Sequence, residues 1–262
     1  MNDTTGKSTV LITGGASGIG RSLAESFADA GYAVPICDAA QGNIDTLQRD
    51  RPELTATVAN VADPDDVDRV FADIRQQHGR LDVLVNNAGV AGPTAKLQDI
   101  ADEEWQTCLA VDLNGPFYFS KRAVPLLLKS PSASIINIAS TAALFGYPLR
   151  SPYAAAKWAL VGLTKTWAME LGPRQIRVNA ICPGSVEGER IDAVIRKDAA
   201  GRGLAQEQVR DVYLRQTSMR TFVSANDIAA MALFLASPAA ARVSGQGISV
   251  DGHTEGLSNW LD

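Results

Sequence analysis

A tyrosine and a lysine four residues apart are the first pair in this sequence whose spacing suits chemistry. Tyr153 and Lys157 occur in Tyr-Ala-Ala-Ala-Lys, and this spacing places two side chains on one face of a helix. A lysine ammonium beside a phenol favours the phenolate, which lets a tyrosine act as a base toward an alcohol or, protonated, as an acid toward a carbonyl. Alone, the pattern is common and more typical of a half-exposed helix pair.

Three glycines supply a second candidate site. Gly14, Gly18 and Gly20 follow the apolar run 9–13, which predicts a buried strand, and helical spacing of apolar residues then continues to Gly31. Glycines let the backbone turn tightly and approach a pyrophosphate, whose charge faces the helix N-terminus. This strand–turn–helix context predicts a dinucleotide-binding loop.

A carboxylate at the end of the second predicted strand indicates which dinucleotide is bound. Asp38 follows the apolar run 33–37, and a carboxylate there accepts hydrogen bonds from ribose hydroxyls and repels a 2′-phosphate. The glycine loop contains no Arg or Lys. These features favour NAD over NADP, while the alternative is an ordinary aspartate that caps a turn.

The elements that must position these residues alternate along the chain. Helical patterns lie at 18–30, 64–79, 102–128 and 153–171, and Ser224 with Asp227 predicts the cap of a further helix. Alternation of this kind predicts an α/β fold with a parallel sheet, helices on both faces and one domain over 1–262. The seven predicted strands are 9–13, 33–37, 54–58, 83–85, 134–138, 176–181 and 247–250.

The segment 184–222 departs from this alternation. Its apolar residues predict two surface helices inserted between the sixth strand and the final helix. Open α/β sheets bind ligands beyond the carboxyl ends of their strands, so the insertion is predicted to be a lid. The alternative is a solvated surface excursion.

Composition argues against several classes of protein. A net charge of −5 without basic runs disfavours a nucleic-acid partner, and no apolar run is long enough to span a bilayer. No signal peptide is evident, and the three scattered cysteines are typical of buried free thiols, so we expect a cytoplasmic protein without a membrane partner. With only two histidines, a metal site and a Ser–His–Asp hydrolase are both disfavoured.

Six motifs in order resemble the short-chain dehydrogenase/reductase family over essentially the whole chain. The resemblance implies a single Rossmann-type, doubly wound domain that oxidises a secondary alcohol or reduces the matching carbonyl. It also implies a homotetramer through the helices 102–128 and 153–171, which carry Phe117, Phe119, Leu163 and Trp167. The motifs are Thr13-Gly-Gly-Ala-Ser-Gly-Ile-Gly20, Asn86-Asn-Ala-Gly89, Asn114 in Val-Asp-Leu-Asn-Gly, Ser140 in Ile-Asn-Ile-Ala-Ser, Tyr153-x-x-x-Lys157 and Pro183-Gly184.

The resemblance also assigns roles to residues. Tyr153 would exchange the proton, and Lys157 would assist it and bind the nicotinamide ribose. Ser140 would bond the substrate oxygen, and Asn114 would anchor a water in a proton relay. Contacts to NAD are expected from Gly14, Ser17, Gly18, Ile19, Gly20, Asp38, Asn60, Val61, Asn87, Ala88, Gly89, Tyr153, Lys157, Pro183, Gly184 and Val186.

Two positions depart from the family pattern. Asn60 stands where many members have an aspartate that meets adenine, and an amide can make an equivalent hydrogen bond. Gly188 stands where the family often has a threonine that helps to hold the cofactor.

The predicted function is NAD-dependent hydride transfer between nicotinamide and a secondary alcohol of the sugar, polyol or hydroxy acid type. Alternatives are an NADP-dependent ketone or 3-oxoacyl reductase of the same family, and a non-catalytic dinucleotide-binding sensor. The pocket is expected to include Ala142, Arg150 and Arg190. The arginines would meet a carboxylate or sugar hydroxyls, or would be plain surface charges.

Overall fold

A single parallel sheet of seven strands organises the chain in the computed structural model, of which we describe residues 6–257. The strand order is β3-β2-β1-β4-β5-β6-β7, and every neighbouring pair is parallel. This confirms the predicted doubly wound, Rossmann-type fold. The strands are β1 (Val10–Thr13), β2 (Pro35–Asp38), β3 (Thr55–Val58), β4 (Val83–Asn86), β5 (Ser134–Ile138), β6 (Arg177–Pro183) and β7 (Gly247–Val250).

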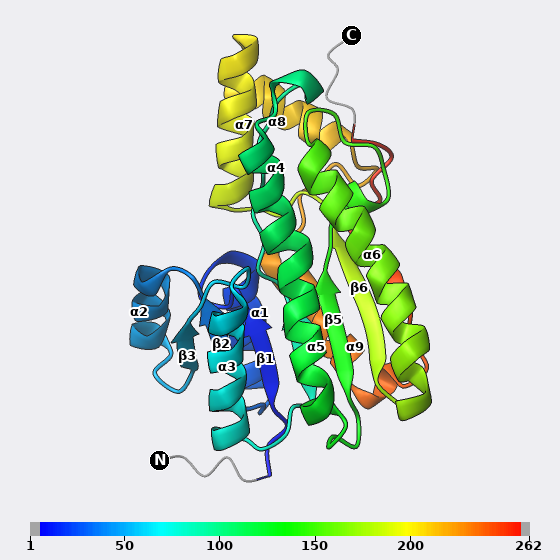
Figure 1. Ribbon diagram of the computed structural model, residues 1–262. Helices are drawn as coiled ribbons and strands as arrows, with labels where there is room; N and C mark the ends of the chain where they lie inside the picture. The colour runs from blue at the N-terminus through cyan, green and yellow to red at the C-terminus, as the bar shows by residue number, and fades with distance from the viewer. Residues whose placement is uncertain (1–5, 258–262) are drawn as a thin grey trace.

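Helices cover both faces of the sheet (Figure 1). Successive strand residues point to opposite faces, so Val10 and Ile12 pack with α1 and α9, whereas Leu11 packs with α3 and α5. Two buried apolar layers result, one on each side of the strands. The helices flanking the sheet are α1 (Gly18–Asp29), α2 (Gln41–Asp50), α3 (Pro64–Gln77), α5 (Gly115–Leu127), α6 (Ser151–Leu171) and α9 (Ala225–Ala236), while α4 (Asp102–Leu109) packs on α6.

Helix caps form where the sequence indicates them. Ser224 Oγ accepts a bond from the Asp227 N–H at 3.2 Å, and Asp227 Oδ2 accepts one from the Ser224 N–H at 2.7 Å. The predicted cap of α9 is thereby confirmed.

Two elements differ from the sequence-based expectation. The helix expected over 102–128 is interrupted by a π-helical segment, Ala110–Asn114, which separates α4 from α5. Helix α2 was not predicted, because only Ile44 and Leu47 are apolar and buried, and Ala40 offers no capping side chain. Packing against the sheet, and not local pattern, stabilises it.

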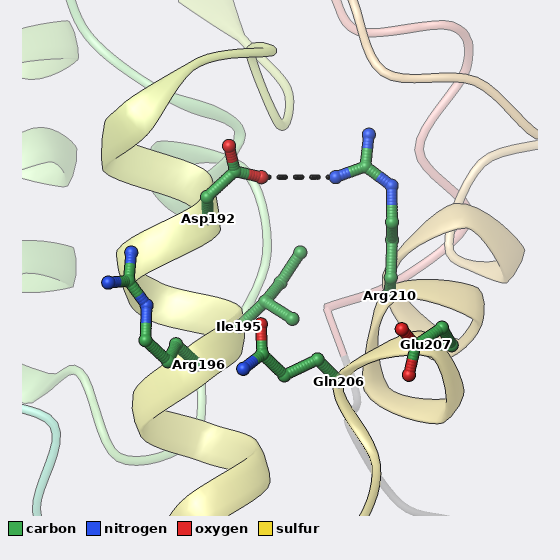
Figure 2. A pocket seen from close by; sticks show the side chains of 6 residues that line it. All are labelled: Asp192, Ile195, Arg196, Gln206, Glu207 and Arg210. Atoms are coloured by element: carbon green, nitrogen blue, oxygen red, sulfur yellow. Dashed lines mark hydrogen bonds and ion pairs between the residues drawn. The ribbon is translucent and has the colours of Figure 1, made fainter.

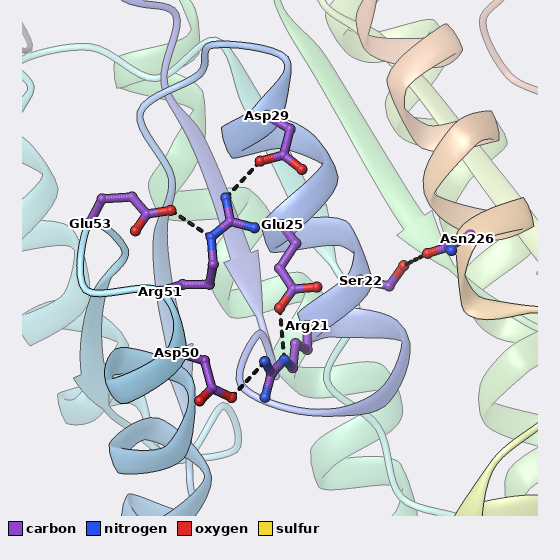
Figure 3. Close-up of polar contacts among 8 residues, drawn as sticks. All are labelled: Arg21, Ser22, Glu25, Asp29, Asp50, Arg51, Glu53 and Asn226. Atoms are coloured by element: carbon purple, nitrogen blue, oxygen red, sulfur yellow. Dashed lines mark hydrogen bonds and ion pairs between the residues drawn. The ribbon is translucent and has the colours of Figure 1, made fainter.

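Exposed ion pairs join α1 to α2 and to the chain that follows it (Figure 3). Arg21 bonds Asp50 at 2.8 Å, and Arg51 bonds Asp29 at 2.7 Å. Exposed pairs contribute little stability each, but these connect the helix behind the glycine loop to the neighbouring βα unit.

The segment 184–222 forms two helices beyond the carboxyl ends of the strands, α7 (Glu189–Arg202) and α8 (Gln206–Arg215) (Figure 1). They share a small apolar cluster that includes Ile195, Val209 and Phe222. None of the helices within 6–257 has the length and apolar character that crossing a membrane requires.

Candidate active site

Tyr153 and Lys157 lie in the first two turns of α6, where the helix meets the end of β5. Lys157 is 4% exposed, and its Nζ donates to the Ile138 carbonyl at 3.1 Å. The same nitrogen lies 5.5 Å from the centroid of the Tyr153 ring. The predicted pair therefore shares one face of a helix at the carboxyl edge of the sheet.

Ser140 follows β5 by two residues and begins a short 3-10 turn, Thr141–Ala143. Its Oγ accepts a hydrogen bond from the Ala142 N–H at 3.1 Å. That bond uses a lone pair and leaves the hydroxyl proton free to be donated to a substrate oxygen.

Among the described residues, no hydrogen bond joins Asn114 to this group. Asn114 is exposed at the end of the π-helical segment, and its side chain makes no hydrogen bond with any described residue. Asp112, two residues earlier, is fully buried, and its Oδ2 lies 3.8 Å from Lys157 Nζ. Asp112, and not Asn114, lies beside the lysine, because residues two positions apart on a helix point in different directions.

Sequence reasoning missed Asp112. The available signal was one carboxylate in an otherwise apolar stretch, Leu109-Ala-Val-Asp-Leu113. An acid on a helix is ordinarily solvent-exposed, so the local pattern did not single it out.

The glycine loop is stapled to the loop after β4. Asn87 Nδ2 donates to the carbonyls of Thr13 and Gly14, each at 3.0 Å. Thr13 Oγ1 in turn accepts from the N–H groups of Asn87 and Ala88, also at 3.0 Å. A side chain at Gly20 would collide with the Gly14 carbonyl and the Asn87 amide, so the close approach requires glycine there.

No described side chain caps the N-terminus of α1. Ser17 is the N-cap, but its side chain makes no capping bond to the helix. The first N–H groups of the helix, at Gly18 and Ile19, therefore remain available for an anion, as pyrophosphate binding requires.

Asp38 is held against the glycine loop. Its Oδ2 accepts from the Ala16 N–H at 3.2 Å, and its Oδ1 accepts from the Ala40 N–H at 3.0 Å. No ion pair to Asp38 occurs within residues 6–257. Through Ala40 the Asp38 carboxylate caps a turn, as the alternative interpretation of this residue holds, and through Ala16 it also contacts the glycine loop.

The other expected cofactor contacts lie at the same edge of the sheet. Asn60 Oδ1 accepts from the Ala62 N–H at 3.0 Å, which leaves its NH2 group free for a base. Val61 is buried and packs against Gly115.

At the end of β6, Pro183-Gly184 leads to a bridge between Val186 and Val223. The bridge uses the N–H groups of Val223 and Glu187, which leaves the Val186 N–H free of it. Gly188 has a φ of 133°, a conformation that strains a threonine and explains the departure from the family pattern.

The expected substrate contacts are placed differently from one another. Ala142 is buried. Arg150 is 5% exposed and donates to the Ala91 carbonyl at 2.6 Å and to Thr94 Oγ1 at 3.3 Å, so it is not a surface charge. Arg190 is exposed on α7, with its guanidinium carbon 6.0 Å from the Tyr153 ring centroid.

Positive charge therefore surrounds the Tyr153 ring. The guanidinium carbon of Arg150 lies 5.4 Å from the ring centroid, close to the distances of Arg190 and Lys157. Positive charges around the ring stabilise a group beside it that gains negative charge during the reaction.

A hollow of about 510 Å³ lies apart from this group, between α7 and α8 (Figure 2). Arg210 and Asp192 close one side of it with an ion pair of 3.1 Å. The complete lining is Asp192, Ile195, Arg196, Gln206, Glu207 and Arg210, so the hollow contains none of the expected catalytic residues.

The cysteines and acidic residues offer no metal-binding set in the described part of the chain, where no three metal-ligating side chains gather. Cys37, Cys108 and Cys182 are buried as predicted. Burial raises the pKa of Cys37 to about 12 and those of Cys108 and Cys182 to about 11, so these thiols are neutral at pH 7.

Comparison with known proteins supports the same family. A family model described as enoyl-(acyl carrier protein) reductase matches residues 14–254. A 3-oxoacyl-[acyl-carrier-protein] reductase of Thermotoga maritima is 36% identical over 92% of this chain and 95% of its own length. A D-beta-hydroxybutyrate dehydrogenase of Rhizobium meliloti is also 36% identical, over 93% of this chain and 97% of its own.

Solved structures with a similar fold include two different nicotinamide complexes. An actinorhodin polyketide ketoreductase with NADPH has a TM-score of 0.90 and 30% identity, covering 97% of this chain and 98% of its own. An NAD+-bound xylitol dehydrogenase has a TM-score of 0.88 and 25% identity, covering 93% and 97%. With the sheet, the glycine loop and the Tyr–Lys pair in the expected places, the chain belongs to the short-chain dehydrogenase/reductase family, whose enzymes are nicotinamide-dependent oxidoreductases acting on alcohol and ketone groups.

Proposed function

We propose that this enzyme transfers hydride between NAD and a secondary alcohol. The observation that carries the choice of NAD is the Asp38 carboxylate, hydrogen-bonded to the glycine loop and without an ion-pair partner among the described residues. Such a carboxylate accepts from both ribose hydroxyls and repels a 2′-phosphate.

The chain's residues fit a dinucleotide. The collision that a side chain at Gly20 would cause marks a cradle shaped for close backbone approach, and the open N-terminus of α1 suits a pyrophosphate. The Asn60 amide and the Val186 N–H are the donors proposed for adenine and carboxamide. The remaining proposed contacts are Ser17, Gly18, Ile19, Val61, Ala88, Gly89, Pro183 and Gly184.

The proposed catalytic group divides the work of alcohol oxidation. The nicotinamide, when bound, accepts the hydride. Tyr153 takes the hydroxyl proton as general base, and Ser140, oriented by the Ala142 N–H, donates a hydrogen bond to the substrate oxygen. Lys157, held by the Ile138 carbonyl, places positive charge beside the phenol. Asn114 remains a prediction for a water contact.

The substrate class we propose is a sugar, polyol or hydroxy acid, with a hydroxy acid favoured. Arg190 projects from α7 toward the Tyr153 ring and has no ion-pair partner among the described residues. A substrate carboxylate would supply that partner. Arg150 is committed to Ala91 and Thr94, and would shape the pocket wall together with Ala142.

The second candidate is an NADP-dependent ketone or 3-oxoacyl reductase. The 36% identity to the Thermotoga maritima 3-oxoacyl reductase favours it, whereas the charge of Asp38 opposes it. A non-catalytic sensor would not need Ser140, Tyr153 and Lys157 together at one strand edge.

Three further predictions belong to this proposal. Helices α7 and α8 act as a lid over the site, since they stand beyond the strand ends. Phe117, Trp158 and Met169 are exposed on α5 and α6, which supports a homotetramer through these helices. The buried thiols favour the cytoplasm as the working compartment. The structure corrects one detail, because Phe119 is buried against Phe71 and is unavailable to a partner subunit.

The test is a panel of sugars, polyols and hydroxy acids assayed with NAD and with NADP by appearance of the reduced nucleotide. Oxidation of a panel member with NAD preferred supports the proposal. Activity confined to NADPH and a ketone or 3-oxoacyl thioester establishes the second candidate. Dinucleotide binding without turnover of any panel member or carbonyl counts for the sensor.

A further inference from the structure

Residues 91–95, which we call the wall segment, lie beside Tyr153 and belong to no helix or strand. At Gly92, a Cβ would lie 4.0 Å from the Tyr153 Cβ and 3.2 Å from Cys108 Sγ, so the segment passes between these two side chains. A segment without secondary structure keeps its place only through the contacts that it makes. Those contacts therefore decide the shape of the site beside Tyr153.

Two residues immediately before α6 hold the wall segment. The Arg150 guanidinium donates to the Ala91 carbonyl at 2.6 Å and to Thr94 Oγ1 at 3.3 Å. The Ala95 N–H donates to the Leu149 carbonyl at 3.0 Å. Within the part of the chain that the structure describes, the wall segment makes no other hydrogen bond, so its position depends on this pair.

Leu149 reaches the wall segment from an unusual backbone conformation. Its φ is 65°, in the left-handed region that residues with a side chain rarely adopt. Such a conformation persists only where the surrounding contacts hold it, and it is frequent at functional sites. The connection between the wall segment and the start of α6 is therefore a specific, held arrangement.

Arg150 is a buried cation whose charge no described carboxylate balances within ion-pair distance. Its Nε is buried without a hydrogen-bond partner among the described residues. The guanidinium carbon lies 5.5 Å from the centroid of the Tyr147 ring and 5.4 Å from that of Tyr153. The two rings and the acceptors of the wall segment are thus what compensates the buried charge.

The shape of the guanidinium explains why arginine occupies this position. Its N–H donors form a rigid planar fork, and its face packs on aromatic rings. A lysine at position 150 would keep the charge but would lack the fork. It could not fix the Ala91 carbonyl and Thr94 Oγ1 together while lying flat against the rings.

We propose that Arg150 is a positioning residue that fixes the wall segment against Tyr153 and so sets the affinity for the substrate before the substrate binds. This inference rests on the proposed function. Val90, which joins the wall segment to the cofactor loop, is held separately through its N–H bond to Asp112 at 2.7 Å. Loosening the wall segment should therefore weaken substrate binding and leave dinucleotide binding unchanged.

The test is Arg150→Lys in the full-length protein, with Arg177→Lys as the matched control. Arg177 is also a buried guanidinium, but it donates to the Leu235 carbonyl at the amino end of β6. With NAD saturating, we expect the KM for the accepted alcohol to rise about 10-fold in Arg150→Lys, roughly the effect of one lost hydrogen bond to a charged group. The kcat and the NADH affinity should stay within a few-fold, and Arg177→Lys should keep the wild-type KM.

Thr94→Val separates the hydrogen bond from the charge. Valine has nearly the shape of threonine, so this variant removes one acceptor of Arg150 and leaves every charge in place. Its KM should rise in the same direction as that of Arg150→Lys. A wild-type KM in Arg150→Lys would mean that the cation alone is sufficient, and it would refute the positioning role.

Amide exchange measured by mass spectrometry is the second readout, and it needs no turnover. The Ala95 N–H should exchange about 10-fold faster in Arg150→Lys than in the wild type, while the Val90 N–H keeps its protection. Thr94→Val takes the place of Arg150→Lys in this measurement if the lysine variant folds poorly. Equal exchange of Ala95 in variant and wild type would overturn the inference. If the wild type oxidises no alcohol, the proposed function fails, while the exchange rates still decide the role of Arg150.

Discussion

The preference for NAD over NADP, which we assign to Asp38, is the prediction to which a magnitude can be given. Two N–H bonds, from Ala16 and Ala40, fix the carboxylate at the glycine loop, so it cannot rotate far from a 2′-phosphate. Two charges about 4 Å apart near a protein surface interact by roughly 4 kcal/mol. Asp38 is partly exposed, so solvent reduces this repulsion, and we expect a preference for NAD of about 10² to 10³ in kcat/KM, or about 3 to 4 kcal/mol.

The assay is steady-state kinetics with NAD and NADP on one accepted alcohol, for the wild type and Asp38→Asn. The amide removes the repulsion and weakens the bonds to ribose, so the preference should shrink by a factor of about 10 or more. Arg at the exposed position Ala39 in addition should move it further toward NADP.

Asp45→Asn is the matched control for net charge. Asp45 is exposed on α2 and bonds Gln41, away from the glycine loop, so this variant should keep the wild-type preference. Equal efficiency of the wild type with NAD and NADP would refute the reasoning, because it would mean that Asp38 does not face the ribose.

Three further outcomes are expected. Tyr153→Phe keeps the ring but removes the exchangeable proton, so kcat should fall by about 10² or more while NADH affinity measured by fluorescence stays within a few-fold; near-normal turnover would contradict the mechanism. Gly89→Ala should lower both kcat and NADH affinity, since the added Cβ crowds Asp112 and Lys157. A wild-type NADH affinity in isothermal titration would contradict this expectation. Sedimentation velocity at micromolar concentration should show a tetramer that Trp158→Glu dissociates, because the indole is exposed on α6; a wild-type monomer would overturn the assembly.

Local sequence determined most of the framework of this protein. Most of the strands are short, largely apolar runs whose residues alternate between two helix layers, so the seven strands and their parallel arrangement could be predicted. The glycine loop and the Tyr153–Lys157 pair were also recognisable, because their spacing within one element fixes their geometry, whereas Ser140 was implied by the resemblance to the family.

Tertiary structure decided the features that depend on contacts between distant segments. Arg150 reads as a surface or pocket charge in the sequence, yet it is buried against the loop containing Ala91. Helix α2 forms with little local signal, since its stability comes from packing on the sheet. Asp112 reaches Lys157 because a π-helical segment turns it inward, 45 positions away along the chain but 3.8 Å away in space. Local pattern reports periodicity within an element, whereas the burial of a charge depends on what the rest of the fold places opposite it.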